Sequence, residues 1–160
     1  MMKVVYIANA CEHVVRPFCD ELYKELGEDF KFLEVVGLDK AREGIGSVQL
    51  RNYVYDMRNS KEEARKLCSD ADIVIFAIVD FYYIQDRIRE NKPTIYYSER
   101  SFKKGIISFF KPKNYFYLNK NFVIPSKNSN FYLLAASSYA SYDFHIINAF
   151  KNKVFKWGYQ

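Results

Sequence analysis

The chain has few of the residues that build disulfide frameworks and metal centres. Three cysteines (Cys11, Cys19 and Cys68) and two histidines are the whole supply among 160 residues, and the cysteines lack CxxC spacing. This pattern argues against a disulfide scaffold or a zinc site and fits a reducing compartment. Cys11 lies two residues before His13, but neighbours in sequence rarely present a nucleophile and its base in working geometry, so we expect no Cys–His catalytic pair.

Long apolar runs are also missing. No stretch approaches the roughly 18 apolar residues of a membrane span, and the N-terminal MMKVVYIANA is too short in its apolar part to act as a signal peptide. We therefore predict a cytoplasmic protein, with a peripheral position on the inner membrane face as the alternative.

Glycines are absent from the loop where a dinucleotide-binding domain needs them. The residues after the first expected strand read NACEH at 9–13, whereas Gly44-Ile45-Gly46 lies in the wrong place and is too short. Because backbone must approach the pyrophosphate closely, NAD or FAD binding is disfavoured, and a P-loop is absent as well. With so few histidines we expect no metal site.

Apolar and aromatic residues, by contrast, are plentiful. The chain is 49% hydrophobic, with 14 Tyr and 14 Phe, and carries a net charge of +5 at pH 7. That is enough apolar surface for one ordinary domain. The positive charge favours anionic partners but says nothing about fold.

Short apolar runs alternate with segments of helical period. The expected strands are residues 3–8, 30–36, 73–78, 94–97, 131–136 and 154–157, with 48–55 as a weaker candidate. Expected helices run from Pro17 to a stop at Gly27, over 61–68 and 83–90, and after Ser137-Ser138, where Tyr142, Ile146 and Phe150 recur every four residues. The alternation predicts an α/β fold: a single Rossmann-like domain with an open, mostly parallel sheet and helices on both faces.

Ligands of such sheets bind beyond the carboxyl ends of the strands, which fixes the candidate site. The polar residues at these ends are our candidates for substrate contact: Asn9, Glu12, Asp80, Ser98, Glu99, Arg100, Ser137, Ser138 and Tyr139. Structural alternatives exist for several of them. Glu99 and Arg100 would also serve as an ion pair closing a surface loop, the two serines as helix caps, and Asp80 and Asp143 as solvated charges.

Several of these stretches together carry a resemblance to a known family. They are NACEHVVRPFCDEL from residue 9, DADIVIFA at 70–77, SER at 98–100, LLAASSYASYDF at 133–144 and KWGY at 156–159. In their order and position at strand tips they resemble the N-terminal half of a GT-B fold glycosyltransferase, in the large bacterial family of retaining enzymes that use nucleotide sugars.

The resemblance implies a protein of two Rossmann-like domains. The N-terminal domain would hold a saccharide or lipid-linked acceptor, and a C-terminal domain, absent from this chain, would bind the nucleotide-sugar donor. This domain would then bind no cofactor of its own and would not transfer sugar alone. By the same resemblance His13 is the catalytic candidate, with helix entry as its structural alternative, while Glu99 and Arg100 would orient sugar hydroxyls or favour charge developing on the leaving diphosphate.

Residues 102–113 form a basic and aromatic segment. On a helix ended by Pro112, Phe102, Ile106, Phe109 and Phe110 share one face. Such a surface fits an anionic membrane, and the alternative is packing on the sheet. The candidates for membrane contact are Lys103, Lys104, Phe109, Phe110 and Lys111.

Two other function classes remain. Tyr-rich loops also suit a non-catalytic module that binds carbohydrate or protein. Nucleic-acid binding is disfavoured, because outside 103–113 the lysines are scattered among acidic residues.

Overall fold

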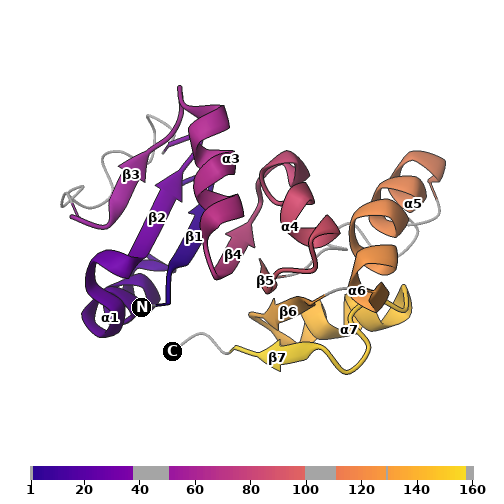
Figure 1. Cartoon of the computed structure of the whole chain (residues 1–160). Helices are drawn as coiled ribbons and strands as arrows, with labels where there is room; N and C mark the ends of the chain where they lie inside the picture. Colours follow the sequence, from indigo (N-terminus) through magenta and orange to yellow (C-terminus); the bar gives the residue numbers. More distant parts are fainter. Residues whose placement is uncertain (1, 38–50, 100–110, 129, 158–160) are drawn as a thin grey trace. The chain divides into compact units, whose positions relative to one another are not determined.

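A computed structural model of the chain describes residues 2–37, 51–99, 111–128 and 130–157 (Figure 1). The chain divides into two compact units, Met1–Ile84 and Gln85–Gln160. Among the described residues, no helix is long and apolar enough to cross a membrane.

The first unit is built on four parallel strands. β1 (Val4–Ala8) lies between β2 (Phe30–Glu34) and β4 (Ile73–Ala77), and β3 (Val54–Asp56) pairs with β2 on its other side. All five residues of β1 are buried. Since successive side chains point to opposite faces, both faces of this strand are covered, as its near-continuous hydrophobicity predicts.

The helices of the first unit begin and end at the expected signals. α1 (Arg16–Leu26) has Pro17 in its first turn, where a missing N–H costs nothing, and Gly27 follows it with φ of +56°. α3 (Lys61–Asp70) buries Ala64 and Cys68. The described part of the unit also has two short 3-10 turns, η1 (Gly27–Asp29) and η2 (Phe81–Tyr83).

The second unit has three parallel strands, β5 (Thr94–Ser98), β6 (Phe131–Ala135) and β7 (Val154–Lys156), with β6 in the middle. α4 (Gln85–Arg89) precedes β5, and α7 (Ser138–Ile146) connects β6 to β7. Its core is aromatic: the ring centroid of Phe150 lies 4.9 Å from that of Phe131 and 5.2 Å from that of Phe144.

Three helical segments follow one another between β5 and β6. α5 (Pro112–Leu118), the π-helical turn η4 (Asn119–Val123) and α6 (Ile124–Asn128) are contiguous. Pro112, which was predicted to end a helix over 102–113, begins α5, because proline is tolerated at the first helical position. The wider π turn accommodates Pro125, which lacks an N–H and would clash with the preceding turn of a regular helix. Residues 102–110 lie outside the described part of the chain.

The expected α/β class with an open parallel sheet is confirmed, since all seven described strands run parallel to their neighbours within each unit. The six stronger strand predictions each match an observed strand to within two residues at either end. Of the weaker candidate at 48–55, only its last two residues fall in β3, and 48–50 lie outside the described residues.

The prediction for the last helix is wrong in its length and in its buried face. α7 ends at Ile146, and Phe150 lies beyond it in a turn with φ of +54°. Tyr142 is 62% exposed, and the face that packs inward carries Ala140, Phe144 and, just beyond the helix, Ile147. The four-residue recurrence of aromatic and aliphatic residues therefore predicted the wrong side of the helix.

Candidate functional site

In the first unit, the loop after β1 is held against the end of β2. The carbonyl of Asn9 accepts hydrogen bonds from the N–H groups of Val36 (3.0 Å) and Gly37 (2.8 Å), and the Cys11 N–H donates to Glu34 Oε2 at 2.9 Å. The backbone of the loop is therefore fixed, which leaves the Asn9 side chain at the carboxyl end of the sheet.

Glu12 and His13 lead into α1. The Glu12 carbonyl accepts from the N–H groups of Val15 (3.1 Å) and Arg16 (3.2 Å), so its backbone starts the first helical turn. The His13 side chain is exposed. Exposure at a strand tip keeps His13 available to a ligand, and its role there remains a prediction.

Cys11 and Cys19 form a buried pair of thiols behind this loop. The hydrogen bond from the Cys19 thiol lowers the pKa of Cys11 against the opposing effect of burial, and the Arg16 guanidinium lowers it further. The same hydrogen bond, together with burial, raises the pKa of Cys19.

The tip of β4 carries a strained residue. Ile78 has φ of +49°, a left-handed conformation that β-branched residues rarely adopt, and its side chain is 77% exposed. Asp80, two residues on, accepts a hydrogen bond from the Tyr82 N–H at 2.9 Å and so caps η2. An exposed capping carboxylate fits the structural alternative, and substrate contact by Asp80 stays a prediction.

In the second unit, four of the predicted residues meet where β5 and β6 end. The Ser137 hydroxyl donates to the Glu99 carbonyl at 2.7 Å and accepts from the Ala140 N–H at 3.2 Å, which makes it the cap of α7. Ser98 is buried, and its carbonyl accepts from the Ala136 N–H at 2.9 Å. Ser138 is exposed beside them.

The remaining candidates divide into exposed, buried and undescribed ones. Glu99 and Tyr139 are exposed, whereas Asp143 is only 3% exposed, so its interpretation as a solvated charge is wrong: α7 turns it toward the inside of the unit. Arg100 lies outside the described residues, so its expected ion pair with Glu99 stays a prediction. Of the candidates for membrane contact, Lys111 is exposed, and Lys103, Lys104, Phe109 and Phe110 lie outside the described residues.

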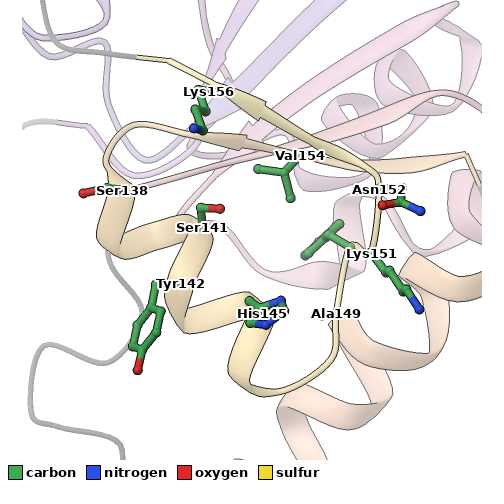
Figure 2. Close-up of a pocket in the computed structure, with 10 residues that line it drawn as sticks. Ser138, Ser141, Tyr142, His145, Ala149, Lys151, Asn152, Val154 and Lys156 are labelled. Atoms are coloured by element: carbon green, nitrogen blue, oxygen red, sulfur yellow. The ribbon is translucent and has the colours of Figure 1, made fainter.

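The second unit also contains a cavity of about 510 Å³ between α7, β7 and the turn that joins them (Figure 2). Ser138, Ser141, Tyr142 and His145 line it from α7. They are spaced at i, i+3, i+4 and i+7, which places them on one face of a helix. The spacing of these four residues is visible in the sequence. We predicted a different face of the helix because we followed the apolar residues of the same segment.

The opposite walls come from β7 and the turn. Val154 and Lys156 alternate with Phe155, so they share one face of the strand, and the turn contributes residues 149–152. In Figure 2 Val154, Lys156, Ser141 and His145 point toward the space between helix and strand. Lys156 is the last residue of β7, and Ser138 is the first residue of α7, which follows β6. The cavity therefore reaches the edge where ligands of open α/β sheets bind.

No protein-family model and no curated protein matches the sequence. Two solved structures are similar in fold over 100% of this chain, each at 11% identity: an alpha-glucosyltransferase in complex with UDP and a 13-mer DNA containing a HMU base (TM-score 0.50), and an alpha-glucosyltransferase in complex with UDP (TM-score 0.48). The chain spans 42% and 44% of those chains, less than half of either. At this identity the likeness shows the fold alone: the chain resembles one Rossmann-like half of a GT-B glycosyltransferase.

Proposed function

We propose that this chain is the acceptor-side half of a glycosyltransferase that transfers a sugar from a nucleotide-sugar donor to a saccharide or lipid-linked acceptor. The observation that carries the proposal is the similarity in fold of the entire chain to about two fifths of a glucosyltransferase. Because the chain covers less than half of that glucosyltransferase, we propose a second domain as its partner, one that binds the donor. The domain described here would bind no cofactor itself.

The strand tips supply groups suited to such an acceptor. In the first unit Asn9 and His13 follow β1, and in the second Glu99 and Ser138 flank the Ser137 cap. Amide, carboxylate and hydroxyl groups orient sugar hydroxyls by hydrogen bonding, which brings the reacting atoms together. His13 would hydrogen-bond the reacting region, and Arg100 would favour the negative charge that develops on the departing diphosphate.

The donor proposed for the first test is a uridine nucleotide sugar. The similar glucosyltransferase is described in complex with UDP, which supports UDP-sugars ahead of other donors. Its complex also contains DNA, so a DNA oligonucleotide belongs among the acceptors tested, although our proposal names saccharides and lipid-linked sugars.

A peripheral position on an anionic membrane is the second part of the proposal. Between Glu99 and Asp143 the sequence has seven basic residues and no Asp or Glu. In the described part of this stretch, the outer face of the helical run 112–128 presents exposed Phe116, Tyr117 and Ile124 alongside Lys113 and Lys120. Apolar side chains mixed with lysines suit the headgroup region of a bilayer, and a lipid-linked acceptor would be found there.

The test uses the protein encoded by the complete reading frame, incubated with a panel of UDP-sugars and with saccharide, lipid-linked and DNA acceptors. We expect release of UDP that increases with a saccharide or lipid-linked acceptor, and we expect His13→Ala to lower turnover at least about ten-fold. Lys24→Ala is the matched control, because Lys24 lies on α1, the helix that follows His13, in an exposed ion pair with Glu21 that contributes little.

Three outcomes would count against the proposal. Failure to turn over any common nucleotide sugar would contradict the transferase and favour a binding module. Transfer to DNA alone would contradict the acceptor class. Equal turnover by the His13 variant and the wild type would remove His13 from the reaction.

A further inference from the structure

The cavity of the second unit is preformed, because the turn that makes one of its walls is anchored from behind. The Phe150 N–H donates to Ser126 Oγ at 3.0 Å, and Lys153 Nζ donates to the Ser126 carbonyl at 2.8 Å. Ser126 is 2% exposed, and its hydroxyl also donates to the Val123 carbonyl at 3.0 Å. These buried contacts hold the turn to α6, so a ligand would enter a space that needs no rearrangement.

The opposite walls are fixed by regular structure. β7 pairs with β6 in register, with Val154 opposite Leu133 and Lys156 opposite Ala135. Ser141 and His145 lie one helical turn apart on α7, on the side away from the buried Ala140 and Phe144. At about 510 Å³ the cavity falls within the range of small-molecule sites.

The lining contains both apolar and polar residues. Ala149, Phe150 and Val154 are its apolar members. In Figure 2 Ser141 and Lys156 point into the cavity from α7 and β7, whereas the Ser138 hydroxyl points away from it. None of the residues that line the cavity is acidic. The single carboxylate on α7, that of Asp143, is 3% exposed and is not part of the lining.

Lys153 and Lys156, both close to the cavity in sequence, have different surroundings. Lys153 is used inside the fold, where its ammonium meets the Ser126 carbonyl. Lys156 is exposed on β7, and the described residues that line the cavity with it include no carboxylate. An ammonium that faces the Ser141 hydroxyl, in a site whose described lining has no acidic group, attracts a negatively charged oxygen cluster, and the adjoining apolar residues favour a ligand with an apolar body.

We propose that this cavity binds a phosphate ester, with its phosphate on Lys156 and Ser141 and an apolar or aromatic group against Phe150 and Val154. Nucleoside phosphates and alkyl phosphates both have this chemistry. Binding here requires no sugar transfer, so this proposal and the proposed function can fail separately.

The experiment titrates the isotopically labelled 160-residue chain and follows backbone amide signals by NMR. The probes are uridine monophosphate, hexyl phosphate and inorganic phosphate, with uridine and hexanol as uncharged counterparts, each up to about 10 mM, where a ligand with Kd near 1 mM is about nine-tenths bound. We expect at least one of the two esters to shift signals of α7 and β7. Its uncharged counterpart and inorganic phosphate should each bind at least about ten-fold more weakly. The two esters distinguish a nucleotide from a lipid source.

Variants separate a built site from general attraction by a basic protein. Lys156→Gln removes the positive charge and keeps a polar side chain, and it should weaken binding of the ester about ten-fold. Ser141→Asp, which brings a carboxylate into the cavity, should abolish binding. Lys127→Gln removes the same charge from an exposed position that does not line the cavity, and it should leave binding unchanged.

The inference is overturned by any of three results: no ester shifts α7 or β7, the uncharged probes bind as well as the esters, or Lys127→Gln weakens binding as much as Lys156→Gln. Equal binding of inorganic phosphate and the esters would also overturn it, because the apolar residues of the lining would then contribute nothing.

Discussion

At the scale of single residues, Ile78 combines backbone strain with exposure. Its φ of +49° costs of order 1–3 kcal/mol for a β-branched residue, and a side chain that is 77% exposed gains little from burial. We expect Ile78→Asn to raise the free energy of unfolding by about 1 kcal/mol, because asparagine tolerates the left-handed region. Urea denaturation measures the change.

The matched control for this substitution is Val36→Asn. Val36 is also a largely exposed β-branched residue just beyond a strand, but it is not among the described residues with positive φ. It should show no such gain. A loss of stability in Ile78→Asn would contradict the assignment of strain.

Asp56, the last residue of β3, and Arg58, just past the strand, give a prediction for pH dependence. The Arg58 side chain donates from Nε to Asp56 Oδ1 at 2.9 Å and its backbone N–H to the same oxygen at 3.1 Å, which lowers the pKa of Asp56 from 3.8 to about 2. A lowered folded-state pKa means that the stabilising effect is present above pH 3.8 and is lost as the pH falls through about 2.

Carboxyl NMR signals measured against pH should place the Asp56 midpoint near 2, and Arg58→Gln should move it up toward 3.8. The control is Asp86, because Arg58→Gln should not change the titration midpoint of its carboxyl group. A midpoint near 3.8 in the wild type would show that the two side chains are not paired in solution.

At the scale of elements, Ser126 connects α6 to the turn before β7. Ser126→Ala leaves the buried N–H of Phe150 without an acceptor side chain, and an unsatisfied buried donor costs about 1–3 kcal/mol. We expect the free energy of unfolding to fall by about 2 kcal/mol. Thermal and urea denaturation test this, with the exposed Ser138→Ala as the control that should change stability by less than about 0.5 kcal/mol.

If Ser126→Ala leaves the free energy of unfolding unchanged, the turn is not anchored by this contact. The reason for treating the cavity as preformed is then removed. The ligand titration and the denaturation of this variant therefore both depend on the turn before β7.

Most strands could be predicted because their signal is local. β1 and β4 are short β-branched runs, and such runs specify strands wherever they are buried. No helix was predicted over 112–128, because Pro112 was interpreted as the end of a preceding helix, whereas it stands at a helix start. The buried face of α7 was predicted wrongly because several of its aromatic and aliphatic residues are exposed, and their spacing in the sequence does not show this.

At the scale of the whole molecule, the charge is unevenly distributed along the chain. Residues 85–160 hold 13 of the 24 basic and 4 of the 19 acidic residues, a net charge of +9, whereas residues 1–84 hold 11 basic and 15 acidic residues, a net charge of −4. The overall value of +5 hides this division. Anionic surfaces should therefore attract the second unit.

We expect the chain to co-sediment with vesicles that contain phosphatidylglycerol and not with vesicles of phosphatidylcholine alone. The pair Lys113→Glu and Lys120→Glu should weaken this binding at least ten-fold, since each lysine near an anionic surface contributes about 1 kcal/mol. Phe116→Ser, at a position that is 69% exposed, should weaken it as well.

The control pair, Lys24→Glu and Lys66→Glu, makes the same change of charge in the first unit. Equal losses in both pairs would mean that only net charge matters, and tight binding to an oligonucleotide without vesicle binding would contradict the membrane proposal.

The sequence by itself determined the α/β class, nearly all strands and the strand tips as the place to look for a site, because β-branched runs, helical periods and turn residues act over a few neighbouring positions. Only the tertiary structure decided that Asp143 is buried, that Ser137 caps a helix, and that Ser141 and Lys156 line one cavity. Side chains on α7 and β7 meet because a crossover connection folds the helix back over the strand, and no local pattern in the sequence records that meeting.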